Sequence, residues 1–210
     1  KMTEHPITNE QPRRSRRRKA TVEEEIANDA IVGSPSDAEV VFIGPVGVGK
    51  TTAVQTLSSV PPINTEVMMF EGAEEFLHTS KTTTTVGIDY GMWVRPDGKV
   101  IGLFGTTGQD RFTDSRTPLL NPDAGIVIWL YGDSDTLGTD LGSWITTAGG
   151  PTNSHRILIG VNYPTDEGLN EIKATLEQLE LGHIRVTTAD PRNIDDVRRV
   201  VNDVLQFNGV

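Results

Sequence analysis

The sequence predicts an α/β fold, with a six-stranded mixed sheet and helices on both faces. Three observations lead to this prediction. Short, wholly apolar runs recur along the chain, as buried parallel strands require. Amphipathic segments with helical spacing separate most of these runs. One pair of extended segments is instead joined by a tight turn, which adds an antiparallel hairpin to an otherwise parallel sheet.

The predicted domain begins with a strand and a helix. Residues 40–43 are all apolar and are followed by glycine, as expected of a buried parallel strand. A helix is expected over 50–59, because the two prolines at 61 and 62 stop it. The long stretch 63–84 is expected to be irregular, with a single helical turn around 71–77.

A hairpin and an alternation of strands and helices complete the domain. Pro96-Asp97-Gly98 supplies turn geometry between extended segments at 86–95 and 99–105. Further strands are expected at 125–131, 157–161 and 184–187, and helices at 135–147, 166–181 and 193–207. The last helix has one apolar face, formed by Ile194, Val197, Val200, Val201, Val204 and Leu205.

Composition divides the chain into two parts. Residues 1–37 combine the basic run from Arg13 to Lys19 with acidic and turn-forming residues, and contain few apolar ones. We therefore expect a disordered tail at 1–37 and a folded domain at 38–210. The absence of cysteine excludes disulfides and thiolate metal sites, and no apolar run reaches the ~18–20 residues that span a bilayer. We expect a cytoplasmic protein.

Charge is distributed unevenly along the chain. Residues 1–20 carry seven Lys and Arg residues against two Glu, and the balance of the net charge of −10 leaves residues 21–210 at −15. A body this acidic argues against nucleic-acid binding, since each phosphate contact needs a cation. The run from Arg13 to Lys19 is compatible with weak contact to the inner face of an anionic membrane, or with a solubilising linker that has no target.

A phosphate-binding loop follows the first predicted strand. The segment GPVGVGKT at 44–51 fits the pattern G-x-x-x-x-G-K-[ST]. Its glycines let backbone N–H groups approach phosphate oxygens, while a lysine neutralises phosphate charge and a hydroxyl is available to Mg²⁺. The predicted nucleotide contacts of this loop are Gly44, Pro45, Val46, Gly47, Val48, Gly49, Lys50, Thr51 and Thr52.

Two further segments resemble those of a known family. TTTTVGIDYG at 82–91 and LFGTTGQDRF at 103–112, together with the phosphate loop, resemble the Ras-like small GTPases. The sequence is most similar to the bacterial MglA-like and actinobacterial conservon-type proteins, over about residues 39–207. The resemblance implies a P-loop NTPase G domain that binds GTP and GDP with Mg²⁺ and acts as a switch through residues 63–85 and 105–120. It also implies effector and activating proteins, including a roadblock-type partner.

The resemblance assigns roles to individual residues. Gln109 would orient the attacking water, Thr85 would close on Mg²⁺ with Thr51, and Lys50 would complete the catalytic set. The Gly108 N–H would contact the γ-phosphate. For the base, Asn162, Tyr163 and Asp166 stand near the family's Asn-Lys-x-Asp pattern, with Asp166 one residue late, and Thr188 and Ala189 resemble the loop that contacts guanine O6.

Two departures from the family bear on catalysis. Gly105 stands where most such proteins have the Asp that holds Mg²⁺, which predicts weaker Mg²⁺ binding unless Asp89 or Asp110 substitutes. Val46 crowds the phosphate loop and predicts slow hydrolysis. A non-hydrolysing scaffold is therefore one alternative function. A small ATP-dependent kinase is another, although no arginine-rich lid segment is present in the sequence.

Overall fold

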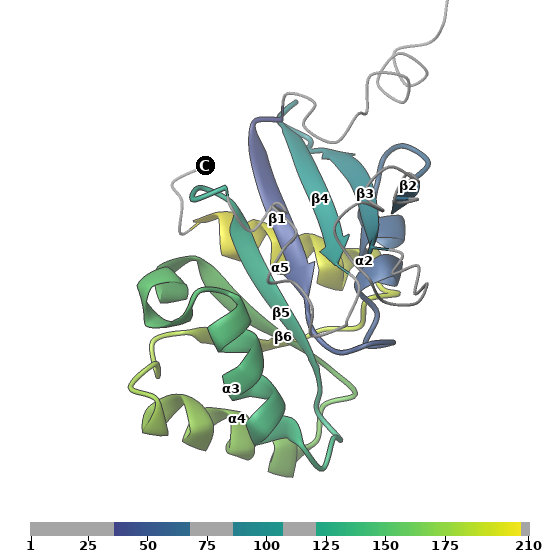
Figure 1. Ribbon diagram of the computed structural model, residues 1–210. Helices are drawn as coiled ribbons and strands as arrows, with labels where there is room; N and C mark the ends of the chain where they lie inside the picture. Colours follow the sequence, from purple (N-terminus) through teal and green to yellow (C-terminus); the bar gives the residue numbers. More distant parts are fainter. Residues whose placement is uncertain (1–35, 68–85, 107–120, 207–210) are drawn as a thin grey trace, which may run out of the picture.

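The computed structural model describes residues 36–67, 86–106 and 121–206 (Figure 1). In this part of the chain, seven strands form one sheet in the order β2-β3-β4-β1-β5-β6-β7. The strands are β1 (Ala38–Ile43), β2 (Ile63–Val67), β3 (Val86–Val94), β4 (Val100–Thr106), β5 (Gly125–Tyr131), β6 (Ile157–Asn162) and β7 (Arg185–Thr188). The predicted mixed α/β fold is confirmed.

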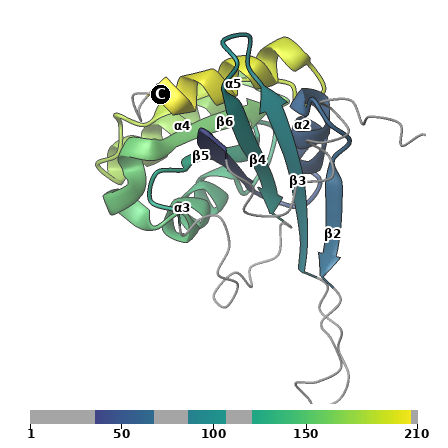
Figure 2. The same ribbon diagram turned by 90° about the horizontal axis from the view of Figure 1, so that it is seen from above.

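Helices cover both faces of this sheet (Figure 2). They are α2 (Lys50–Leu57), α3 (Leu137–Thr147), α4 (Asp166–Gln178) and α5 (Ile194–Gln206), and the 3-10 helix η2 (Gly150–Arg156) precedes β6. The four α-helices agree with the predicted ones except at their ends. The 3-10 helix was not predicted, because its sequence GPTNSHR has no apolar periodicity.

The strand count is a correction to the sequence-based expectation of six strands. The prediction of an irregular stretch from Ile63 onward is wrong for residues 63–67, which pair antiparallel with β3 and place Ile63 opposite Tyr90. The sequence INTEV carries only two apolar residues, so its own pattern does not indicate a strand. As the edge strand of the sheet it is defined by hydrogen bonds to β3, which no local pattern reveals.

Alternate residues of the central strands pack into two separate cores. In β1, Val41 and Ile43 belong to the core that includes α3 and α4, whereas Val40 and Phe42 belong to the core that includes α2 and α5. Wholly apolar strands are required here because both faces of the sheet are covered. None of the described helices is long and apolar enough to cross a membrane.

The strand directions bring several loops together. β1 pairs in parallel with β5, β5 with β6, and β6 with β7, so the carboxyl ends of these four strands lie at one edge of the sheet. The loops that follow them, 44–49, 132–136, 163–165 and 189–193, therefore begin at the same edge. In open α/β sheets this edge is where ligands bind.

A glycine fixes how α4 packs against one of these loops. A Cβ at Gly168, in the first turn of α4, would lie 1.9 Å from the Gly132 carbonyl oxygen. We predict that Gly168→Ala lowers the free energy of unfolding by about 2 kcal/mol, despite the higher helix propensity of alanine. Gly142→Ala in α3 is the matched control, because no atom lies within 4 Å of its added Cβ. It should raise that free energy by about 0.5–1 kcal/mol.

Urea unfolding followed by circular dichroism measures both changes. Stabilisation by Gly168→Ala equal to that by Gly142→Ala would contradict the packing of α4 described above.

Candidate functional site

The loop between β1 and α2 has the conformation that its glycines predict. Gly44, Gly47 and Gly49 have φ values of 138°, 79° and 113°, in the left-handed region that favours glycine. A Cβ at Gly44 would also lie 2.1 Å from the Trp129 carbonyl oxygen, and one at Gly49 would lie 2.3 Å from Pro191 Cγ. The loop is therefore held between β5 and the segment that precedes α5.

The start of α2 is open to an anion. Gly49 is the N-cap residue and supplies no side-chain hydrogen bond to the helix. The N–H groups of Lys50, Thr51 and Thr52 have no acceptor within the helix, whose first hydrogen bond runs from the Ala53 N–H to the Gly49 carbonyl oxygen. The helix dipole adds positive potential at this end. A phosphate placed here would accept these hydrogen bonds.

Lys50 is a buried cation within this loop. Its side chain is 5% exposed, and Nζ donates hydrogen bonds to the carbonyl oxygens of Gly44 and Pro45, both at 2.7 Å. Burial lowers the pKa of Lys50 to about 8, while the Asp89 carboxylate opposes that shift. A phosphate oxygen near Nζ would favour the charged form, since an opposite charge offsets the cost of burial.

A carboxylate on β3 reaches the loop, as the sequence allowed for Asp89. The Thr51 hydroxyl donates a hydrogen bond to Asp89 Oδ2, and Asp89 lies on β3 directly opposite Gly105 on β4. A Cβ at Gly105 would be 3.3 Å from the Asp89 Cβ, so the Asp89 side chain occupies the space beside Gly105. β3 thus places a carboxylate beside Gly105, a position of β4 that has none.

These donors fit Mg²⁺. A hydroxyl and a carboxylate are hard oxygen ligands of the kind that Mg²⁺ takes beside phosphates. Within the described ranges no three His, Asp or Glu side chains converge to hold a metal. An ion beside Thr51 and Asp89 would therefore draw its other ligands from phosphate, water and the predicted ligand Thr85, which lies outside the described residues.

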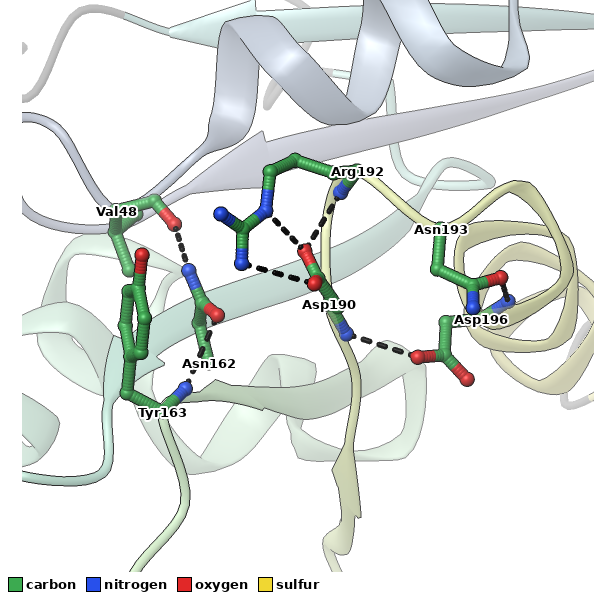
Figure 3. A network of polar contacts seen from close by, with 7 residues as sticks. All are labelled: Val48, Asn162, Tyr163, Asp190, Arg192, Asn193 and Asp196. Carbon is green, nitrogen blue, oxygen red and sulfur yellow. Dashed lines mark hydrogen bonds and ion pairs between the residues drawn. The ribbon is translucent and has the colours of Figure 1, made fainter.

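Asn162 joins the phosphate loop to a second loop (Figure 3). It ends β6 and is 6% exposed. Its Nδ2 donates to the Val48 carbonyl oxygen at 3.0 Å, and its Oδ1 accepts from the Tyr163 N–H at 3.0 Å. Both arms of the amide are used, so a buried side chain fixes the spacing between the two loops.

Tyr163 presents an aromatic surface next to this link. Its backbone has a φ of 50°, and its side chain is half exposed. Its ring stacks on that of Tyr131, with centroids 6.4 Å apart and an interplanar angle of 18°. The Tyr131 hydroxyl in turn donates to the Val46 carbonyl oxygen at 3.3 Å, which ties the aromatic pair to the phosphate loop.

A pocket of about 340 Å³ opens beside Tyr163. Of the residues predicted to contact a base, Asn162, Tyr163, Thr188 and Ala189 line it. Asp166 is not among the lining residues: it is the exposed first residue of α4. The lining residues are Asn162, Tyr163, Pro164, Thr188, Ala189, Asp190, Arg192, Asp196 and Arg199.

The position of Asp166 follows from the capping of α4. The Thr165 hydroxyl accepts a hydrogen bond from the Gly168 N–H at 3.0 Å and donates to the Gly132 carbonyl oxygen at 2.9 Å. Thr165 is thus the N-cap, and the helix begins with Asp166. An acidic residue at this place interacts favourably with the helix dipole.

The N–H of Ala189, predicted to contact a base oxygen, is already engaged. It donates to the Val161 carbonyl oxygen at 3.0 Å. The pocket is also lined by polar groups to which the sequence assigned no role of their own, namely Asp190, Arg192, Asp196 and Arg199. Asp190 is the third residue of the triplet that resembles the base-contacting loop, and the other three carry no signal beyond their place after a strand at the carboxyl edge of the sheet.

Several predicted site residues lie outside the described residues. They are Thr85, Gly108 and Gln109. Thr52 lies within α2, next to Thr51.

No protein-family model matches this sequence, and no curated protein matches it. Solved structures do match in fold. The G domain of the T. maritima FeoB iron transporter aligns with a TM-score of 0.52 and 15% identity over 81% of this chain and 98% of that one. A Plasmodium falciparum structure described as nucleolar GTP-binding protein 1 aligns with a TM-score of 0.55 and 12% identity, over 83% and 89%.

The cytosolic domain of the T. maritima FeoB iron transporter, in its GMPPNP form, aligns with a TM-score of 0.50 and 17% identity over 82% of this chain. The alignment covers 64% of that cytosolic domain, which is less than two thirds of its length. At these identities the similarity defines the fold. The chain has the fold of a P-loop GTPase G domain.

Proposed function

We propose that this chain is a nucleotide-dependent switch that binds GTP and GDP and hydrolyses GTP slowly. The observation that carries the proposal is the hydrogen bond from Asn162 to the Val48 carbonyl. It joins a loop suited to phosphates to a pocket with an aromatic wall, which are the two halves of a nucleoside phosphate site. Support for guanine nucleotides comes from the similar structures, among which the cytosolic domain of the FeoB iron transporter is in GMPPNP form.

The phosphate end of the site would use the first turn of α2 and Lys50. Mg²⁺ would be held by Thr51, by Asp89 and, as the sequence implies, by Thr85. When bound, Mg²⁺ neutralises charge on the β- and γ-phosphates. Asp89 replaces the carboxylate that Gly105 lacks, so we no longer expect Mg²⁺ binding to be weak.

Hydrolysis and switching belong to the same proposal. By the family resemblance, Gln109 would orient water, and residues 63–85 and 105–120 would rearrange with the γ-phosphate. Val46 is expected to keep hydrolysis slow until an activating protein binds. A roadblock-type partner and effector proteins would then distinguish the two nucleotide states, while the run from Arg13 to Lys19 would make weak contact with the inner membrane surface.

The proposal is tested first at Lys50. Lys50→Ala removes the cation of the phosphate loop, so we expect GDP affinity to fall at least about tenfold, a loss of about 1.4 kcal/mol. Lys173→Ala, an exposed position on α4, is the matched control and should leave the affinity unchanged. Equilibrium titration with fluorescent GDP measures both. Equal GDP affinity for Lys50→Ala and wild type would refute the phosphate site.

The role of Asp89 is tested through metal dependence. In wild type we expect chelation of Mg²⁺ to accelerate GDP release strongly. Asp89→Asn should bind Mg²⁺ about tenfold more weakly, as is typical for the loss of a metal-supporting carboxylate. Chelation should then accelerate its GDP release much less.

Stopped-flow release of fluorescent GDP, with Mg²⁺ and with chelator, gives this ratio for each variant. Glu177→Gln on α4 removes an equal charge from an exposed position and serves as the control. If Asp89→Asn kept the wild-type ratio, Asp89 would have no part in metal binding.

A further inference from the structure

An arginine and an aspartate that line the pocket beside Tyr163 form a bidentate pair (Figure 3). Arg192 Nε donates to Asp190 Oδ1 and Arg192 Nη2 donates to Asp190 Oδ2, both at 2.9 Å. Two parallel N–H groups of one flat guanidinium thus meet the two oxygens of one carboxylate. This is the bidentate arrangement that carboxylates favour.

The same guanidinium lies over an aromatic ring. Arg192 Cζ is 5.8 Å from the centroid of the Tyr163 ring. Within the pocket, a flat group that carries two parallel N–H donors is therefore placed over Tyr163 and held by Asp190.

Guanine presents the same pattern to a protein. Its N1–H and N2–H groups are two parallel donors at the edge of a flat ring, whereas adenine has an acceptor at N1. We propose that Asp190 is the carboxylate that accepts these two guanine hydrogen bonds, and that the Arg192 guanidinium lies where the base binds, so that the base must displace it from Asp190. This inference rests on the proposed binding of GTP and GDP.

Asp190 is held in position without the Arg192 side chain. Its Oδ1 also accepts from the backbone N–H of Arg192 at 2.9 Å, and its own N–H donates to Asp196 Oδ2 at 3.0 Å. Asp196 is in turn paired with Arg199 at 2.7 Å. These contacts would keep the carboxylate oriented after the guanidinium moves away.

The pair can be opened by a ligand. The side chains of Arg192 and Asp190 are 62% and 40% exposed, and ion pairs with this exposure contribute little stability. Hydrogen bonds and charge from Arg192 lower the pKa of Asp190, so its carboxylate is ionised at neutral pH and acts only as an acceptor.

The alternative acceptor is Asp166, which the sequence pattern favours. Asp166 is exposed at the start of α4, where Thr165 caps the helix, and it does not line the pocket. The two possible acceptors, Asp190 and Asp166, therefore predict different nucleotide affinities when each is replaced by asparagine.

The test measures the affinity of the full chain for GDP, ADP and xanthosine diphosphate. Xanthine carries an oxygen in place of the guanine N2 amino group, so it pairs with an amide rather than a carboxylate. Asp190→Asn should lower GDP affinity and raise xanthosine diphosphate affinity, each at least about tenfold, and leave ADP affinity unchanged. Asp166→Asn, the matched control, should leave all three affinities as in wild type.

The Arg192→Ala variant tests whether the Arg192 guanidinium competes with the base for Asp190. Since it removes a group that competes with the base, GDP affinity should stay equal or rise about two- to threefold. A tenfold loss of GDP affinity in Arg192→Ala would show that the guanidinium does not compete with the base.

The outcome for Asp190 is distinct from that of the proposed function. Wild type that binds GDP, with an Asp190→Asn variant that keeps the wild-type ratio of GDP to xanthosine diphosphate affinity, would overturn this inference alone. Wild type that binds none of the three nucleotides would overturn the proposed function together with it.

Discussion

The hydrogen bond from the Asn162 amide to the Val48 carbonyl is the contact on which the geometry of the site depends. Val48 is buried in the core that includes α2 and α5, and Asn162 ends a strand whose residues are all buried. The hydrogen bond therefore joins a buried residue of the phosphate loop to the end of a buried strand. Separating the two loops would leave a buried amide and a buried carbonyl without hydrogen-bond partners, which is costly in free energy. The hydrogen bond therefore keeps the two loops at a fixed distance.

Two acidic side chains reach this site from outside the phosphate-loop motif. Asp89 lies on β3 and stands beside Gly105 of β4, where the small GTPases that the sequence resembles have a carboxylate. Asp190 lies in the loop after β7 and lines the pocket that Asp166 does not line. β3 runs antiparallel to β4, so the start of β3 lies beside the end of β4, and β7 runs parallel to β6, so their following loops begin at the same edge of the sheet. A carboxylate can therefore be supplied by either neighbour. Fold geometry, rather than sequence position, then decides which groups meet the ligand.

This geometry explains how much the sequence could predict. The phosphate loop was predictable because its glycine spacing, its lysine and the apolar strand before it all depend on local backbone conformation. The edge strand β2 could not be predicted from the sequence, because residues 63–67 are extended through their pairing with β3. The pair of Asp190 and Arg192 was not predictable either. Its role depends on β7 lying beside β6, which brings the loop after β7 next to Tyr163.

The central claim is that one site holds both the phosphates and the base. Hydrogen–deuterium exchange of the full chain measures this directly, with GDP and Mg²⁺ in one sample and pyrophosphate and Mg²⁺ in another. We predict that GDP slows amide exchange at 44–52 and also at 162–165 and 188–192. Pyrophosphate should slow it at 44–52 alone. If GDP left amide exchange at 44–52 unchanged, the result would contradict the account.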